Sequence, residues 1–554
     1  MPIEVYPPSR NTLKSITTQF ALQRDDWNDY SFQTLYHLHY KHGREPTDVT
    51  YIGGVKILKR GQTKGDRQFI RQKFDKLGPE FCSVGTSLDY YQRLNDMPGR
   101  HRTTIMRAIN DAVAYPDLVN SFSNEEGWTT SVFRDNSDWR AFLDDARILY
   151  EGNFGALPDM TQAFSYFPPN SQVPIAFDFS APEPAFYSGP YRREGLSRKK
   201  TLLPERIVVL VGRNGSGKST LLSRLAHVAF ASPQERATAQ VKVLGRLDPA
   251  AIGFMRVITI SYSAFDSFIV PGIAARDLTQ ITQDIENGDG RFIFCGLRDI
   301  VAEVRDDIDK AEKGAPNDEV DVVVERRTST RLKPVDELAS EFARLLSRIR
   351  QNGTENLFAA TLEPLLGDPS FTELREQLDN LFGSTGRGRR IFLGWSTGHK
   401  IALHVVASLV ANARPRSLIL FDEPEAHLHP PLMAALMHAV RIVLTEVNAF
   451  CVVATHSPVL LQETLARHVR AIRRVDDQFE VVQPALETFG ENVGVLTYGT
   501  FGLTASSTDF HKVLDLLVTG CDSIEEIDQL FAPGLSGQAR AYVLSRFASK
   551  GGGT

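Results

Sequence analysis

From residue 207 onward, short and almost purely apolar runs recur along the chain, and each one ends in polar residues. They are IVVLV at 207–211, LILF at 418–421 and FCVVA at 450–454. Uninterrupted runs of this length are typical of strands that are buried on both faces of a parallel sheet. Apolar residues at helical spacing follow the first run and precede the second. The pattern therefore predicts an α/β fold with a mixed or parallel sheet flanked by helices.

A different pattern occupies residues 1–165, which we expect to form a separate α+β extension. Polar and apolar residues alternate over 32–40, a turn follows, and 51–58 supplies a second strand, so a hairpin is predicted there. Helical periodicity marks 102–119 and 137–150. Nothing in this extension resembles a catalytic constellation, and its sequence leaves its role open.

Three histidines, His37, His39 and His42, lie on or beside the first of these strands. A metal site is one interpretation of this cluster. However, His37 and His39 fall on the same strand face, which we expect to be solvated, and no acidic or cysteine residue stands at ligand spacing. An ordinary surface is therefore the favoured interpretation.

Length and composition describe an ordinary globular protein. At 554 residues the chain is too long for one hydrophobic core, and its 42% hydrophobic content suits a globular fold. The formal net charge of −5 provides no general attraction for nucleic acid or anionic lipid, so such contacts must come from local patches. Four scattered cysteines without a C-x-x-C pair, no apolar segment of membrane-spanning length and no signal peptide predict a cytoplasmic protein.

The first apolar run leads into a glycine-rich loop, VGRNGSGKST at 211–220. This is G-x-x-x-x-G-K-[ST] with a strand before it and a helix after it, the context in which the motif binds nucleotide phosphates. Backbone N–H groups and the helix N-terminus would surround the β- and γ-phosphates, Lys218 adds a positive charge, and the Ser219 hydroxyl can bind Mg²⁺. The predicted nucleotide-binding residues are Asn214, Gly215, Ser216, Gly217, Lys218, Ser219 and Thr220.

Two carboxylates, Asp422 and Glu423, end the second apolar run. In an open parallel sheet, ligands bind beyond the carboxyl ends of the strands, where both side chains would arrive. Because side chains alternate along a strand, the two carboxylates point in different directions. We predict that Asp422 and Ser219 hold the metal and that Glu423 is the general base or positions the attacking water.

The third apolar run ends in THSP, so His456 is expected at the same edge of the sheet, where it would sense or stabilise the γ-phosphate as a catalytic residue. Ser396, Thr397 and Gly398 stand just before a predicted helix. By itself this triplet is an ordinary helix N-cap. Its place between the phosphate loop and the carboxylates is what makes it a candidate for binding a second phosphate face.

In this order the motifs resemble those of an ABC-type P-loop ATPase head, over residues 170–480. The matching segments are the Walker A loop at Gly212–Ser219, a degenerate signature at 395–399 (WSTGH), Walker B with its catalytic glutamate at 418–423, and the switch histidine His456. The resemblance implies ATP and Mg²⁺ as cofactors and a homo-oligomer of at least two subunits. Ser396, Thr397 and Gly398 of one subunit would then close in trans over ATP bound to another.

Further segments resemble a narrower group. FDEPEAHLHPP and ATHSP resemble AAA-family ATPases of the OLD kind, and SYSAFDSF, FCGLRD and ETFGENVGVLTYGTFGL resemble the ATPase subunit of Septu and retron anti-phage systems. This resemblance implies an ATPase that restrains or licenses a separately encoded HNH nuclease, with retron reverse transcriptase and its DNA or RNA as further partners. A DNA-repair or recombination ATPase acting directly on DNA ends is the alternative, and an ATP-binding scaffold with little turnover is a third.

Two departures from the ABC pattern concern the closing of the site. The glutamine expected after the second strand of the head is missing from SYSAFDSF, and Ser263 or Asp266 is the candidate replacement. The signature has Trp395 and His399 where Leu and Gln are usual, so hydrolysis is expected to be slow.

No compact D-x-D cluster of acidic residues, of the kind that binds a nuclease metal, follows His456. We therefore expect any nuclease activity to belong to a partner protein.

These motifs define the expected domain organisation. The segments are 166–270 and 391–480 for the two parts of the head, 271–390 for a mostly helical insertion, and 481–554 for a C-terminal helical segment. Basic residues at 326–333 border an acidic stretch and predict a solvated loop. The basic cluster at 192–200 is either a solvated loop or a contact for phosphate or nucleic acid.

Overall fold

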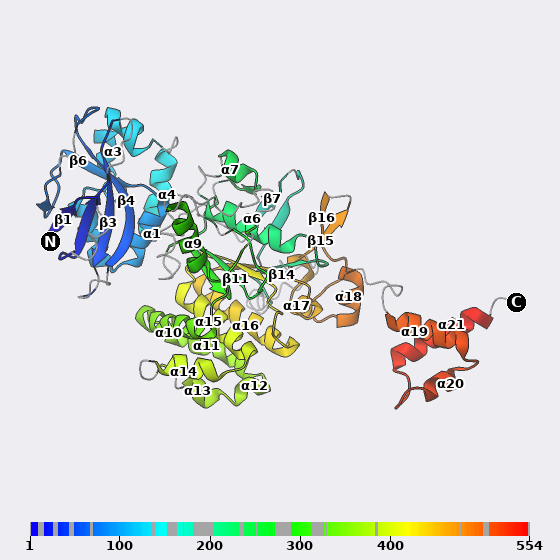
Figure 1. Cartoon of the computed structure of the whole chain (residues 1–554). Helices are drawn as coiled ribbons and strands as arrows, with labels where there is room; N and C mark the ends of the chain where they lie inside the picture. The colour runs from blue at the N-terminus through cyan, green and yellow to red at the C-terminus, as the bar shows by residue number, and fades with distance from the viewer. Residues whose placement is uncertain are drawn as a thin grey trace, which may run out of the picture.

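Figure 1 shows the chain as a computed structural model, in which three bodies follow one another from the N-terminus to the C-terminus. They are an N-terminal α+β unit, a central body built on a large sheet, and a small group of C-terminal helices. The structure describes residues 2–8, 16–25, 31–41, 43, 49–66, 70–134, 139–151, 163–169, 171–180, 203–231, 236, 238–250, 252–269, 271, 290–312, 326–327, 329–379, 381–382, 386–475, 478–501 and 509–551.

A six-stranded sheet forms the centre of the N-terminal unit. Its strand order is β5-β1-β2-β3-β4-β6; β1 and β2 run parallel and the other neighbouring pairs run antiparallel. The strands are β1 (Ile3–Tyr6), β2 (Phe20–Arg24), β3 (Leu35–Lys41), β4 (Val49–Lys59), β5 (Lys73–Phe74) and β6 (Phe81–Gly85). The antiparallel pair β3–β4 confirms the predicted hairpin.

Helices pack around this sheet through one buried apolar cluster. They are α1 (Leu88–Asp96), α2 (Gly99–Ala108), α3 (Asp117–Phe122), α4 (Trp139–Glu151) and the π-helical turn η2 (Trp128–Val132). α4 confirms the helix predicted over 137–150, but the single helix predicted over 102–119 is wrong. The chain leaves α2 because Asn110 adopts a left-handed conformation with φ of 53°, and it resumes a helix only after Pro116.

The histidines of β3 differ from the expected solvated pair. His39 is only 5% exposed, and burial lowers its pKa to about 4. His37 hydrogen-bonds the Asp25 carboxylate at 2.6 Å and the Tyr51 hydroxyl at 2.9 Å. His42 lies outside the described residues. Among the residues that the structure describes, no group of three or more His, Cys, Asp or Glu side chains is arranged to hold a metal ion.

The central body contains a seven-stranded sheet with the order β12-β11-β13-β14-β9-β15-β16. Its strands are β9 (Ile207–Val211), β11 (Val257–Ser261), β12 (Phe292–Gly296), β13 (Leu418–Asp422), β14 (Phe450–Thr455), β15 (Val469–Val475) and β16 (Gln478–Val482). Neighbouring strands run parallel except for the antiparallel β15–β16 hairpin. The three apolar runs of the sequence are its three central strands, which confirms the mixed sheet.

Alternate residues of these strands serve two separate cores. Val209, Phe421 and Val453 point into the core shared with α10, α15 and α16, whereas Leu210 and Leu420 point into the core shared with α6 (Lys218–Phe230). This two-sided burial is why the strands carry no polar alternation. A small sheet, with the order β10-β7-β8, joins the α6 side. Its strands are β7 (Ala163–Phe167), β8 (Ile175–Asp178) and β10 (Arg246–Asp248).

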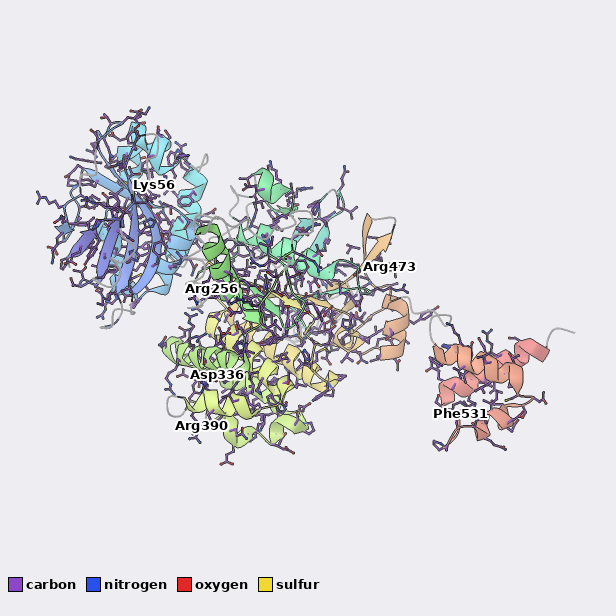
Figure 2. The ribbon with its side chains drawn as sticks, viewed as in Figure 1. Lys56, Arg256, Asp336, Arg390, Arg473 and Phe531 are labelled. Atoms are coloured by element: carbon purple, nitrogen blue, oxygen red, sulfur yellow. The ribbon has the colours of Figure 1, made fainter. Side chains whose placement is uncertain are left out.

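A helical layer covers the other face of the large sheet (Figure 1). Its helices are α10 (Val335–Asn352), α11 (Glu355–Leu366), α12 (Pro369–Thr372), α13 (Arg375–Asp379), α14 (Arg387–Gly394), α15 (Thr397–Asn412) and α16 (Pro430–Val447). Shorter or peripheral elements of the central body are α7 (Ala239–Lys242), α9 (Ile300–Glu312), α17 (Pro458–Gln462), η6 (Ala466–His468) and α18 (Val493–Phe501). Figure 2 labels two buried cations, one in each of the first two bodies: Lys56, 6% exposed, and Arg256, 1% exposed.

Three of the expected segment boundaries fall inside structural elements. The limit at 165/166 cuts β7, the limit at 390/391 cuts α14, and the limit at 480/481 cuts β16. The segment 271–390 is also more than an insertion, because its strand β12 pairs with β11 at the edge of the large sheet. Backbone hydrogen bonds set these limits, within the helix for α14 and between paired strands for β7 and β16, and local composition does not report them.

The chain ends in three helices around a small core of their own. They are α19 (Asp509–Gly520), α20 (Ile524–Gln529) and α21 (Gly537–Gly551), with Leu514, Val518, Ile527 and Val543 buried between them. All three lie within 481–554, the segment that we expected to be helical. Figure 1 shows this group apart from the central body.

Within the described residues, α16 is the one helix long and apolar enough to suit a bilayer, although the sequence led us to expect none. Leu436, Val440 and Leu444 of this helix are fully buried. The helix also packs against α11 and α15. These contacts identify α16 as a core helix of the central body.

Candidate nucleotide site

The glycine-rich loop links β9 to α6, and its glycines adopt conformations that other residues disfavour. Gly215 has a φ of 80° and Gly217, the N-cap of α6, has a φ of 92°. At Gly212 a Cβ atom would lie 2.6 Å from the carbonyl oxygen of Ile472, so there the neighbouring strand leaves room only for glycine. The loop therefore turns tightly just before the N-terminus of α6, which is the backbone arrangement that binds anions.

Lys218 folds back over this loop. Its Nζ donates hydrogen bonds to the carbonyl oxygens of Gly212, at 2.9 Å, and Arg213, at 3.2 Å. Burial lowers the pKa of Lys218, while the nearby carboxylates of Glu423, Asp422 and Glu425 act in the opposite direction. The ammonium group of Lys218 is buried, and its hydrogen-bond acceptors are backbone carbonyl oxygens of the loop itself. It can replace these acceptors with the oxygens of a phosphate bound in the loop while it stays buried.

Strand register brings the other candidate residues to the same edge of the sheet. Ser261 of β11 pairs with Asp422 of β13, which pairs with Ala454 of β14, which in turn pairs with Leu210 of β9. The phosphate loop, the two carboxylates and His456 therefore all follow the carboxyl ends of adjacent parallel strands. This is the edge at which open α/β sheets bind ligands.

Asp422 lies directly beside the first turn of α6. The Ser219 hydroxyl donates a hydrogen bond to Asp422 Oδ1 at 3.1 Å. Burial raises the pKa of the Asp422 carboxyl to about 7; the Glu423 and Asp266 charges also raise it, and the Ser219 hydrogen bond and Lys218 lower it. One hydroxyl and one carboxylate, both oxygen donors in a site rich in negative charge, suit Mg²⁺. Ser219 and Asp422 would hold this cation, which supplies charge neutralisation to the bound phosphates.

Glu423 follows Asp422 at the end of β13, and its backbone leaves the extended conformation. Its φ is 48°, and its N–H donates to the carbonyl oxygen of Ala454 at 2.9 Å, continuing the strand pairing by one residue. A left-handed conformation at a residue other than glycine costs about 1 kcal/mol or more. The half-exposed Glu423 carboxylate consequently faces His456, with 3.9 Å between Oε1 and Nδ1.

His456 is held by a residue that the sequence did not single out, Glu425. Glu425 Oε1 accepts hydrogen bonds from the Thr455 hydroxyl and from the His456 N–H, both at 2.7 Å, and lies 3.1 Å from His456 Nδ1. The imidazole is thus oriented by a carboxylate on the neighbouring strand end. The only signal in the sequence was the E-P-E spacing, because the contact forms between strands that are far apart along the chain.

The signature residues begin α15. Ser396 is its N-cap, and its hydroxyl accepts a hydrogen bond from the N–H of His399 at 3.3 Å. Ser396 and Thr397 are exposed, whereas Trp395 is buried and donates its indole N–H to Gln377 at 2.9 Å. The unusual Trp395 therefore anchors this turn to α13 and leaves the serine and the helix N-terminus facing outward.

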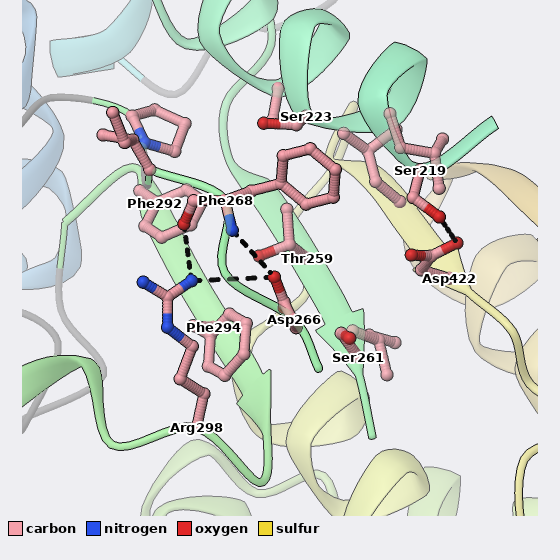
Figure 3. A pocket seen from close by; sticks show the side chains of 16 residues that line it. Ser219, Ser223, Thr259, Ser261, Asp266, Phe268, Phe292, Phe294, Arg298 and Asp422 are labelled. Carbon is pink, nitrogen blue, oxygen red and sulfur yellow. Dashed lines mark hydrogen bonds and ion pairs between the residues drawn. The ribbon is translucent and has the colours of Figure 1, made fainter. Parts of the chain in front are cut away.

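The loop after β11 places its two candidate residues differently. Ser263 accepts a hydrogen bond from the N–H of Phe265 at 3.2 Å and caps the turn. Asp266 lines a cavity of about 60 Å³ together with Ser219 and Asp422 (Figure 3). Of the two residues, Asp266 is thus the one that shares a cavity with the Walker motifs.

The basic cluster predicted at 192–200 lies outside the described residues.

Three comparisons with known proteins bear on this site. Residues 325–462 match the family model described as "AAA domain, putative AbiEii toxin, Type IV TA system". This match includes the signature, Asp422, Glu423 and His456, but not the phosphate loop. The chain is also similar to protein ea59 of Escherichia phage lambda, with 29% identity over 556 residues that cover 96% of this chain and 95% of ea59.

Two solved structures are similar at low identity. One is an inward-facing ABC transporter of the metal-chelate type, with 14% identity, coverage of 58% of this chain and 84% of that chain, and a TM-score of 0.25. The other is an SmcHead bound to the C-winged helix domain of ScpA, with 13% identity, coverage of 58% and 96%, and a TM-score of 0.24. The strand-edge geometry and the family match together support an ABC-like AAA ATPase domain with an α/β P-loop fold.

Proposed function

We propose that this protein is an ABC-type ATPase that binds and hydrolyses ATP at subunit interfaces and controls a separately encoded effector, an HNH nuclease, in an anti-phage complex. The observation that carries the ATPase proposal is the 3.1 Å hydrogen bond between Ser219 and Asp422. It joins the phosphate loop to the carboxylate-ended strand at the point where a phosphate-bound cation would lie. The effector and the anti-phage role rest on the resemblance of the sequence to Septu and retron ATPase subunits.

In this proposal the residues of the chain divide the work by position. The loop N–H groups and Lys218 bind the β- and γ-phosphates, and Lys218 gives up its contacts with the Gly212 and Arg213 carbonyls to do so. Glu423, half-exposed at the strand end, accepts a proton from the attacking water. His456, oriented by Glu425, donates a hydrogen bond to the developing charge on the γ-phosphate.

Completion of the site by a second subunit is supported by the exposure of the signature. Ser396 and Thr397 are exposed at the N-terminus of α15, a helix of 16 residues. A helix N-terminus of this length favours a negatively charged partner. The γ-phosphate of ATP bound to another copy of the chain provides such a partner, so ATP would assemble the subunits and hydrolysis would release them.

Two substitutions test the ATPase and its assembly. Lys218→Ala should abolish ATP binding, while Glu423→Gln should keep ATP binding, stop turnover and trap an ATP-dependent oligomer. Nucleotide affinity, phosphate release and mass by size-exclusion chromatography with light scattering measure the three effects. Lys242→Ala and Glu446→Gln, at exposed helix positions, are the matched controls. An oligomer that ignores ATP in Glu423→Gln would contradict the composite site.

The effector is tested by co-expression with an HNH nuclease encoded next to this gene. Affinity capture of the tagged ATPase should retain the nuclease, and Lys218→Ala and Glu423→Gln should alter nuclease release or activity in opposite directions. If no nuclease is captured and the purified chain alone binds DNA ends in a salt-sensitive manner, the repair ATPase is the better description.

A further inference from the structure

The N-terminal unit takes no part in the proposed reaction, yet it carries a cavity of about 480 Å³ between α2 and the segment after β5. This volume lies within the range of ligand sites in proteins. The described residues that line it are Asp75, Lys76, Gly99, Arg100, Thr103, Thr104, Arg107 and Ala108. We call this cavity the α2 groove. Its lining is almost entirely polar or charged, unlike that of most small-molecule sites.

One wall of the α2 groove is a single face of the helix. Arg100, Thr103, Thr104 and Arg107 recur at intervals of three or four residues, which places them on the same side of α2. The two threonine hydroxyls donate hydrogen bonds to carbonyl oxygens of the helix itself, at 2.9 and 2.7 Å. Short side chains therefore lie between the two arginines, which are about 10 Å apart along the helix axis.

The opposite wall is fixed to the end of α2 by backbone hydrogen bonds. The N–H of Leu77 donates to the carbonyl oxygen of Ala108 at 2.7 Å. The side-chain amide of Asn110 donates to the carbonyl oxygens of Leu77, at 3.2 Å, and Gly78, at 2.8 Å. Leu77 is also buried in the core of the N-terminal unit. Lys76 directly precedes this anchored segment, so the groove is built into the fold.

The three cations of the α2 groove are exposed, and none of them contacts a carboxylate among the described residues. Arg100 Nε lies 3.2 Å from His101 Nε2, and Arg107 Nε lies 3.5 Å from the Tyr115 hydroxyl. Lys76 has no ion pair within the same part of the chain. Positive charge is therefore concentrated here without neutralisation by protein groups.

Other exposed cations of the same unit are neutralised. Lys64 Nζ lies 2.9 Å from Glu126 Oε1, and Lys73 Nζ lies 3.2 Å from Glu4 Oε1. In the α2 groove, three positive side chains face one carboxylate, Asp75, which leaves two net positive charges among the described lining residues. The first turn of α2 contains no acidic residue either. A concave surface of this kind attracts an anion.

The lining also indicates which kind of anion fits. Nucleotide bases are usually held by aromatic stacking or by apolar walls, and the described lining contains no aromatic residue and one apolar side chain, Ala108. The charges are spread over the length of the groove. Along one strand of duplex DNA a phosphate recurs about every 3.4 Å, so about three phosphates span the interval of about 10 Å between Arg100 and Arg107.

We propose that the α2 groove binds the phosphodiester backbone of a nucleic-acid strand, with Lys76, Arg100 and Arg107 as its phosphate contacts. Phosphate contacts fix the position of a strand and carry no base sequence information. The N-terminal unit would thus hold nucleic acid independently of its sequence. This inference goes beyond the proposed ATPase and does not rest on ATP binding.

The test measures the affinity of the full chain for a fluorescently labelled oligonucleotide of mixed sequence, by anisotropy and without ATP. A salt slope of about 0.7 to 0.9 per phosphate contact corresponds to a loss of roughly 5- to 8-fold for each contact removed at about 0.1 M salt. Lys76→Ala, Arg100→Ala and Arg107→Ala should each show a loss of this size. The triple variant should lose roughly 100- to 500-fold, and its salt slope should fall by about 2 to 3.

Lys64→Ala is the matched control, because it removes an exposed cation of the same unit that is paired with Glu126. It should leave the affinity unchanged. Arg100→Lys keeps the charge and should keep most of the affinity, whereas Asp75→Asn removes a negative charge from the groove and should strengthen binding. Equal losses in Lys64→Ala and Arg100→Ala would mean that overall charge attracts the strand, and the groove would be refuted.

Unlabelled competitors separate the possible anions. Single-stranded DNA, duplex DNA and RNA of one sequence show which backbone binds most tightly, and competition by any of them supports the proposal. A closed circular strand should compete as well as a linear one, because the groove contacts the backbone and no end. If ATP or polyglutamate competes equally well, or if no oligonucleotide binds at low salt, the proposal is wrong.

One variant separates this inference from the proposed function. Lys218→Ala should abolish ATP binding and leave oligonucleotide affinity unchanged, while the triple variant of the groove should bind ATP like the wild type. If Lys218→Ala loses oligonucleotide binding and the triple variant keeps it, the strand binds at the central body and the groove is refuted. If the wild type binds oligonucleotide through the groove but binds no ATP, the proposed ATPase fails and this inference stands.

Discussion

His404, on α15, is a histidine held neutral in the core of the central body, and its replacement tests the packing between α15 and the sheet. It is 1% exposed, and its Nδ1 hydrogen-bonds the Tyr262 hydroxyl at 2.6 Å. Its Nε2 lies 3.6 Å from Glu341 Oε1. Burial lowers the pKa of His404 to about 4, with Glu341 acting against this shift and Lys333 and Arg344 adding to it.

The sign of the pH effect follows from that pKa. In the unfolded chain the histidine takes up a proton near its ordinary pKa of about 6.5, whereas in the folded protein it stays neutral down to about pH 4. Its contribution to stability is therefore complete above pH 6.5 or so and is lost as the pH falls toward 4. At pH 5 the loss relative to pH 8 is about 2 kcal/mol, from the ratio of the two protonation equilibria.

The variant His404→Gln removes the titrating group and keeps an acceptor of similar size for Tyr262. At pH 8 we expect it to be less stable than the wild type by about 1–2 kcal/mol, because the hydrogen bond is remade imperfectly. At pH 5 this gap should shrink by about 2 kcal/mol, since only the wild type pays for a neutral histidine. Denaturant or thermal unfolding at both pH values measures the gap.

An exposed histidine on the next helix supplies the control. His438→Gln on α16 should show the same small stability difference at both pH values. A gap for His404→Gln that stays constant between pH 8 and pH 5 would show that burial does not keep this imidazole neutral. A gap that widens at pH 5 would mean that His404 is charged and paired with Glu341, so that protonation stabilises the folded protein instead of destabilising it.

Two further substitutions test close contacts at the carboxyl edge of the sheet. Gly296→Ala should prevent folding or lower the free energy of unfolding by about 3 kcal/mol or more, because the added Cβ atom would lie 1.8 Å from the carbonyl oxygen of Ser261. A thermal melt measures the effect. Gly253→Ala is the control, because an added Cβ atom there would meet open space. Glu425→Gln should keep ATP affinity but slow turnover roughly tenfold, because the amide holds His456 less firmly than the carboxylate does. If Glu425→Gln releases phosphate as fast as the wild type, the proposal that Glu425 orients His456 for hydrolysis is wrong.

The agreement between sequence and structure is best where local pattern and tertiary packing demand the same thing. The apolar runs became the central strands because both of their faces are buried, and Gly215 and Gly217 of the phosphate loop have positive φ values because the turn requires them. The long helix predicted over 102–119 failed for the opposite reason, because its apolar periodicity continues across Asn110, where the backbone is left-handed.

The candidate site shows the same division. Sequence alone determined the phosphate loop, the carboxylates Asp422 and Glu423 and the order of the motifs, because each depends on neighbouring residues along the chain. Tertiary structure alone decided that the Glu425 carboxylate contacts His456 and that Arg298 lies beside Asp266, since these contacts cross between separate strands and loops. Parallel strands bring their carboxyl ends to one edge regardless of the length of chain between them, and only the register of the folded sheet tells which side chains meet there.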